Sequence, residues 1–235
     1  MTRTRMLGSA VLAAALATTL TACGSSEADE FADQSVKQIK ADVQKDMGSL
    51  KSMTIDGSFN NDGKKTSLKL SADTDGNCVG TLGQDGAEAD IISVGGASYI
   101  KADEAFWKAQ AGPSAEQIIS LLDGKWAKLP SSAGTFSEFC DLDSFLDEIN
   151  QDDDAGTVVT KGDLEEIGGK QALEIKSKAD DGTTHGWVAA EGKHYFLRME
   201  MGGKDKGSFD FSDFNKAVDA KAPSEDNVFD MSSMG

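Results

Sequence analysis

The sequence predicts an α+β fold in which a curved antiparallel sheet of about ten or eleven strands forms a half-barrel closed by helices. Two runs of residues with period-two alternation, 53–101 and 158–211, predict the strands, and glycine-rich turns separate them. A block with helical periodicity lies between the two runs. Because a twisted sheet of that length tends to curl, we expect an apolar interior between sheet and helices.

Charge excludes one class of function at the outset. The chain has 235 residues, with 23 Lys and Arg against 40 Asp and Glu, which gives a formal charge of −17. A general nucleic-acid binder needs clustered basic side chains to neutralise phosphate, so no nucleic-acid partner is predicted. Hydrophobic residues make up 39% of the chain, so we expect a modest core.

The first 22 residues predict a bacterial export signal. A basic start at Arg3 and Arg5 precedes residues 6–20, which are apolar or small and uncharged. That stretch is shorter than the roughly 20 residues that span a hydrocarbon core. The sequence Leu-Thr-Ala-Cys at 20–23 resembles the lipobox of bacterial lipoproteins. By that resemblance the chain is cut between Ala22 and Cys23, and Cys23 receives acyl chains such as palmitate.

Cys23 therefore predicts the place of the protein in the cell. Two or more acyl chains make a stable anchor, so we expect a lipid-anchored protein on the extracytoplasmic face of the cell membrane. The alternatives are an ordinary secretory signal with an unrelated cysteine, or a transmembrane anchor. Residues 23–33, mostly small, polar and acidic after the cysteine, predict a tether. Residues 34–235 then predict a single domain with a polar C-terminal tail.

The two remaining cysteines, Cys78 and Cys140, predict a disulfide, because an exported chain enters an oxidising compartment. Two free thiols or a metal pair are the alternatives. A structural metal site wants four ligands at short spacing, and no histidine lies near either cysteine in the sequence. No metal and no cofactor is predicted.

The elements follow from changes in the apolar period along the chain. An apolar stripe at steps of three and four residues predicts a first helix over 34–50. The first run predicts strands over 53–59, 67–72, 78–82, 87–94 and 97–101. The middle block predicts helices over 104–110, from Pro113 to 122 and over 137–149, with a short strand over 126–129. The second run predicts strands over 158–161, 163–167, 171–178, 183–190, 194–201 and 208–211.

A set of apolar strand residues predicts the wall of a cavity between sheet and helices. Its members are Ile55, Leu68, Leu70, Leu173, Ile175, Tyr195, Leu197, Met199, Met201, Phe209 and Phe211. Alternation places 195, 197, 199 and 201 on one face of their strand, and flexible methionines suit an irregular ligand. The same side chains could equally form packed core, and the sequence leaves both interpretations open.

The lipobox and short motifs along most of residues 30–230 resemble actinobacterial cell-envelope lipoproteins of the LppX/LprG group, which share the LolA-like half-barrel. The motifs are the lipobox, the amphipathic first helix, 95–101 with Phe106-Trp107, 124–129, 167–175, and 209–215 with Pro223. The resemblance implies a protein that carries the acyl chains of lipids, lipoproteins or glycolipids between sheet and helices. It carries no individual ligand residue over to this chain.

The sequence contains fragments of catalytic and metal-binding motifs, but none of them includes all the residues that an active site or a metal site needs. Ser98 and Lys101 have the spacing of penicillin-recognising enzymes, but strand alternation puts them on opposite faces. His185 and His194 are expected at the surface. The acidic runs at 73–77 and 152–154 predict solvated turns, with a weak divalent-cation site as the alternative. The sequence therefore predicts no enzyme.

Two hypotheses of function remain. The first is a membrane-anchored lipoprotein that binds or carries a lipid or other apolar ligand in the half-barrel. The alternative is a non-enzymatic protein-interaction or sensor module of the cell envelope with a filled core, whose acidic surface would face a basic protein partner. An apolar cavity of several hundred Å³ would favour the first hypothesis.

Overall fold

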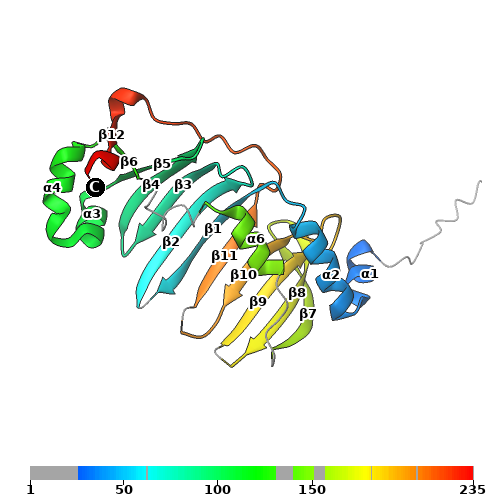
Figure 1. Cartoon of the computed structure of the whole chain (residues 1–235). Helices are drawn as coiled ribbons and strands as arrows, with labels where there is room; N and C mark the ends of the chain where they lie inside the picture. The colour runs from blue at the N-terminus through cyan, green and yellow to red at the C-terminus, as the bar shows by residue number, and fades with distance from the viewer. Residues whose placement is uncertain are drawn as a thin grey trace, which may run out of the picture.

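The computed structural model of the chain describes residues 26–61, 63–130, 140–150, 157–180, 182–204 and 206–234. The predicted export signal, the cleavage site at Ala22–Cys23 and the acidic run at 152–154 lie outside these residues. The described chain forms one curved sheet of 12 strands, with the helices placed along it (Figure 1).

The strand order shows how two meanders join into one sheet. It runs β12-β6-β5-β4-β3-β2-β1-β11-β10-β9-β8-β7, and β1 pairs with β11 so that Ile55 lies opposite Phe211. The first meander consists of β1 Ser52–Asn61, β2 Lys64–Asp73, β3 Cys78–Gln84, β4 Ala87–Val94, β5 Ala97–Ala102 and β6 Trp126–Lys128. The second consists of β7 Val158–Ile167, β8 Lys170–Ala179, β9 Gly182–Ala189, β10 Phe196–Met201 and β11 Gly207–Ser212. The half-barrel predicted from the sequence is confirmed.

The C-terminal tail corrects the predicted strand count and the prediction of a purely antiparallel sheet. The tail runs back along the molecule to the far edge of the sheet, where β12, Val228–Asp230, pairs parallel to β6 (Figure 1). The predicted strands 158–161 and 163–167 are a single strand, β7, with an irregularity between Lys161 and Leu164. A strand of three residues is too short for its period to stand out in a polar tail.

Helices α2 and α6 lie over one face of the sheet, whereas α1 lies toward one end of the molecule and α3 and α4 toward the other (Figure 1). They are α1 Glu27–Asp33, α2 Val36–Met47, α3 Glu104–Ala111, α4 Ala115–Leu122 and α6 Leu142–Asn150, with short 3-10 turns at Gly112–Ser114, Glu225–Asn227 and Met231–Met234. Ser26 and Ser35 cap α1 and α2 through capping boxes closed by Asp29 and Gln38. Side chains of α2 and α6 pack in the same core as those of the sheet.

Helix α1 corrects the prediction that residues 23–33 are a tether. Residues 27–33 are helical, and Ala28 and Phe31 are each only 2% exposed. The acidic composition hid this helix, whereas the capping box between Ser26 and Asp29 signals it. Fewer residues therefore separate Cys23 from the first helix than the sequence predicts.

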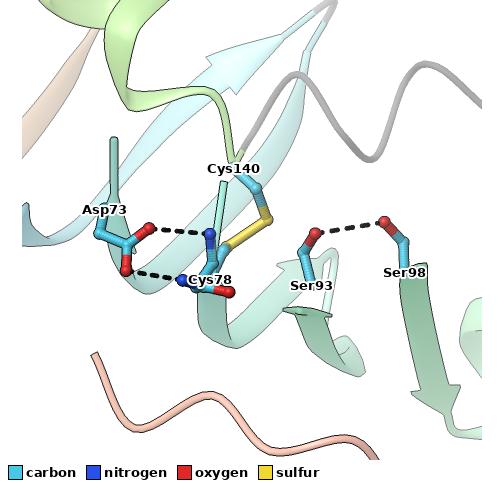
Figure 2. Close-up of a disulfide and its surroundings, with 6 residues drawn as sticks. Asp73, Cys78, Ser93, Ser98 and Cys140 are labelled. Carbon is cyan, nitrogen blue, oxygen red and sulfur yellow. Dashed lines mark hydrogen bonds between the residues drawn. A yellow bond between two sulfur atoms is a disulfide. The ribbon is translucent and has the colours of Figure 1, made fainter. Parts of the chain in front are cut away.

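Cys78 and Cys140, the predicted pair, form a disulfide with a Cα–Cα distance of 5.4 Å (Figure 2). It joins the start of β3 to the residues just before α6, and both cysteines are buried. Helix α6 begins at Leu142, so Cys140 precedes the helix and does not lie in its first turn as predicted. The disulfide therefore holds the start of α6 against the first meander.

Candidate apolar binding site

A cavity of about 170 Å³ lies between α2 and the strands of the second meander. Helix α2 contributes Val36, Ile39, Lys40, Val43 and Gln44. The strands contribute Val159, Ile175, Ser177, Thr184, Gly186, Val188, Phe196 and Met199. Most of these side chains are apolar, and the polar ones are Lys40, Gln44, Ser177 and Thr184.

Local sequence explains why the cavity has this shape. The apolar stripe of α2 turns Ile39 and Val43 toward the sheet, where both are buried. Alternation in β9 brings Gly186 and Val188 to the same side. A Cβ atom at Gly186 would lie 2.7 Å from Cε1 of Phe196, so the ring occupies the space that a side chain would need. The glycine thereby lets Phe196 form part of the wall.

Of the predicted wall residues, Ile175 and Met199 line this cavity. Leu70, Leu173, Tyr195 and Phe211 are buried in the main core, and Ile55, Leu68 and Phe209 pack against it half-buried. These seven residues belong to the packed core, which is the other interpretation that the sequence left open.

The predicted common face of Tyr195, Leu197, Met199 and Met201 is wrong. The pairing of β10 with β9 shifts between Phe196 and Arg198, which is the signature of a β-bulge. Phe196 and Met199 consequently line the cavity, while Leu197 packs with Trp187 and Ala189 in a second cluster. The sequence carries no turn residue in 196–198 that would signal the bulge, so its alternating pattern predicts a regular strand there.

The carboxylate of Asp46 fixes the end of α2 to the connection between β9 and β10. It accepts hydrogen bonds from Nζ of Lys193 at 2.8 Å and from the backbone N–H of His194 at 3.0 Å. Burial on its own would raise the pKa of Asp46, but these two hydrogen bonds outweigh it and hold the pKa below the usual value. Asp46 therefore stays ionised at neutral pH and keeps the helix against the sheet.

Helix α1 is held to the same connection. The ring of Phe31 stacks on His194 with centroids 4.0 Å apart, and Glu27 Oε1 accepts a hydrogen bond from the Gly192 N–H at 2.9 Å. The Lys161 ammonium donates to backbone carbonyl groups at the end of α1. His194 is therefore half-buried and packed, not a solvated surface residue as predicted.

The other predicted surface histidine, His185, belongs to a polar cluster on the opposite side of the second meander. Its Nδ1 lies 2.7 Å from Oε1 of Glu174, and Lys176 lies 2.9 Å from the other oxygen of that carboxylate. Alternation puts these residues on the side away from Ile175 and Gly186. Burial would raise the pKa of Glu174, but the two partners lower it overall. Sequence reasoning missed this cluster because its members lie on different strands.

The residues of the candidate cation loop at 73–77 and of the Ser98–Lys101 pair make contacts that belong to the local backbone and strand structure, not to a binding site. Asp73 Oδ1 accepts hydrogen bonds from the backbone N–H groups of Asp75 and Asn77, so its carboxylate closes its own turn. Ser98 lies 3.5 Å from the Ser93 hydroxyl, and Lys101 is exposed. Among the residues that the structure describes, no group of three His, Cys, Asp or Glu is placed to bind a metal ion. Within that same part of the chain, no helix has the length and apolar character to cross a membrane.

Comparison with known proteins shows the fold. No protein-family model matches the chain, and no curated protein matches it. The crystal structure of LprF from Mycobacterium bovis is similar with a TM-score of 0.59 at 13% identity, covering 83% of this chain and 98% of that one. The crystal structure of the Mycobacterium tuberculosis lipoprotein LppX has a TM-score of 0.53 at 14% identity, covering 80% of this chain and all of that one. The chain therefore has the LolA-like fold that the sequence predicts.

Proposed function

We propose that the chain is a non-enzymatic, membrane-anchored lipoprotein of the cell envelope that binds an apolar ligand between α2 and the second meander. The observation that carries the proposal is the cavity between helix and sheet, lined mostly by apolar side chains; its volume of about 170 Å³ is smaller than the several hundred Å³ that would favour ligand binding by size alone. Cys23 would supply the anchor on the extracytoplasmic side. Binding would be driven by removal of apolar surface from water, and it needs no covalent step.

The size of the cavity limits what fits without movement. A dry cavity of about 150 Å³ accepts a ligand the size of benzene. The present cavity would therefore hold a short part of an acyl chain, and a longer chain requires α2 to move away from β8 and β9. Two contacts at Asp46 oppose that movement, from Lys193 and from the His194 N–H.

Native mass spectrometry of a soluble form that begins at Gly24 and so lacks the acylated Cys23, purified from an actinobacterial host, tests ligand binding. We expect a co-purified mass that organic extraction releases as lipid. The variant Val159→Phe fills the cavity wall and should lower the bound fraction several-fold. The matched control Val79→Phe changes a half-buried valine that lies outside the cavity and should bind as the parent does.

A clean mass that stays unchanged after incubation with envelope lipids would contradict ligand binding and favour the alternative. In that case the LolA-like domain serves as a protein-interaction or sensor module, and its excess of acidic residues faces a basic partner. The specific observation in favour of this second function is that most of the predicted wall residues lie in packed core.

A further inference from the structure

A second hollow of about 1050 Å³ lies behind the cavity wall. We call it the outer groove, and its lining residues come from 166–171, 189–198 and 210–216. Val188 and Phe196 line the inner cavity, whereas their neighbours Ala189 and Leu197 line the outer groove. The two hollows therefore share strands β9 and β10 as a common wall.

The outer groove combines an apolar floor with charged sides. Leu197 is only 6% exposed, and the rings of Tyr195 and Phe214 pack with centroids 4.6 Å apart. The charged lining residues are Lys170, Lys193, Arg198 and Lys216 against Glu166, Glu191, Asp210 and Asp213. Formal charges in the groove therefore cancel, although the chain as a whole carries 23 basic against 40 acidic residues.

Lys170 differs from the other three cations of the outer groove. Lys193, Arg198 and Lys216 each form an ion pair with a carboxylate, at 2.8, 2.7 and 2.6 Å. Nζ of Lys170 instead lies 5.8 Å from the centroid of the Phe214 ring, and it pairs with no carboxylate among the residues that the structure describes. Of the four cations, Lys170 is therefore the one whose ammonium group can turn to an external anion without leaving a carboxylate of the described residues.

Chain length places the anchor beside this groove. Glu27 bonds to Gly192, which is one of the groove residues, and Cys23 lies four residues before Glu27. Four extended residues reach at most about 14 Å. The opposite edge of the sheet lies much farther away, because 12 strands at a spacing of about 4.8 Å span roughly 50 Å. Figure 1 shows α1 and α4 at these two ends of the molecule.

We infer that the outer groove faces the bilayer that carries the acyl chains of Cys23 and binds a phospholipid head group of that bilayer, with Lys170 contacting the phosphate. The inference rests on the acylation of Cys23 proposed above. The groove places apolar ring surface beside charged side chains, and such an amphipathic surface suits the depth of the head groups, where apolar and polar surroundings meet. The neutral groove can approach an anionic surface that repels the rest of the acidic chain. The wall of the ligand cavity would then lie next to the membrane.

The test measures which end of the acylated, full-length mature protein touches the lipid. The protein is inserted into vesicles of equal parts phosphatidylcholine and phosphatidylglycerol that contain a lipid with a nitroxide on its head group. A fluorophore is attached at Glu191→Cys on the rim of the groove, or at Lys125→Cys beyond α4 as the matched control; both native residues are exposed. We expect head-group nitroxide to quench the first probe several-fold more than the second.

Charge reversal then tests the role of Lys170. In the protein labelled at position 191, Lys170→Glu should lower quenching several-fold, and Lys125→Glu should leave it unchanged. Lys170 is exposed, so the variant is expected to fold; if its thermal unfolding shifts, Lys170→Gln replaces it.

Each failure has its own meaning. A protein that does not float with vesicles contradicts the acyl anchor, and the inference falls with it. A protein that floats normally but shows equal quenching at both positions overturns the inference alone, and the groove is then open to a protein partner. Normal quenching in Lys170→Glu overturns the assignment of that lysine to the phosphate.

Discussion

At the scale of single residues, a β-bulge and a glycine determine which side chains line the cavity, and the alternating pattern of the sequence does not reveal either effect. The bulge near Leu197 moves that side chain to the second cluster, while Phe196 enters the cavity wall. Gly186 makes room for the Phe196 ring on the neighbouring strand. A sequence pattern records which residues are apolar, but a one-residue slip exchanges the faces of a strand. For this reason the sequence pattern selects Ile175 and Met199, which line the cavity, but passes over Phe196, which lines it as well.

Glu174 provides a residue-scale prediction. Its buried carboxylate is held by His185 and Lys176, so Glu174→Gln should lower the free energy of unfolding at pH 7 by about 1–3 kcal/mol. The native pKa lies below the ordinary 4.5. The stabilising contribution is therefore complete above that value and is lost as the pH falls through the native pKa.

Urea unfolding at pH 7 and at pH 3.5 measures this effect. The parent should lose more stability between the two pH values than Glu174→Gln does, because only the parent has this carboxylate to protonate. Glu88→Gln, at an exposed position in β4, is the control and should follow the parent. Equal losses in the parent and in Glu174→Gln would show that the ion pairs contribute no pH-dependent stability.

At the scale of elements, the period-two segments predicted most strands, because each buries one face and turns at glycines with positive φ, such as Gly95 and Gly96. The elements that the sequence missed, α1 and β12, are short. A helix of seven residues is stabilised by its cap and by tertiary contacts. The stacking of Phe31 on His194 is such a tertiary contact, and no local sequence pattern reveals it. β12 depends on pairing with β6, a hundred residues earlier in the chain.

The disulfide supports an element-scale prediction about α6. It closes a sequence separation of 62 residues, for which the chain-entropy model gives at most about 4 kcal/mol. The double variant Cys78→Ala/Cys140→Ala should lose stability up to that amount, and amides of α6 should exchange faster with deuterium because the start of the helix is released. Denaturant unfolding and hydrogen exchange of the chain from Gly24 provide the two readouts.

Reduction supplies the control for that prediction. A reductant should bring the parent to the stability of the double variant and leave the double variant unchanged. If reductant lowers both equally, it acts elsewhere than on this disulfide. If the double variant keeps the parent's exchange rates in α6, the helix is held by its packing alone.

At the scale of the whole molecule, the half-barrel could be predicted from the number and shortness of the strands. The size of the cavity could not, because it depends on how closely α2 approaches β8 and β9, and on which apolar side chains fill the space. The docking of α1 likewise could not be predicted from the sequence, because it brings residues near 30 into contact with the connection near 192. That contact determines where the predicted anchor leaves the domain.

The C-terminal strand leads to the last prediction, which concerns the edge of the sheet. β12 covers β6, whose Ala127 is completely buried, and Lys128 pairs with Asp230 at 3.0 Å. A chain that ends after Lys221 lacks β12, so the edge of β6 that faces away from β5 loses its strand partner. An uncovered strand edge can pair with a second chain, so we expect faster amide exchange in β6 and concentration-dependent self-association by light scattering. Asp230→Asn is the control, because it removes the ion pair and keeps the strand, and it should remain monomeric wherever the parent does. A truncated chain with unchanged exchange in β6 would show that this edge is protected by its own short length and not by β12.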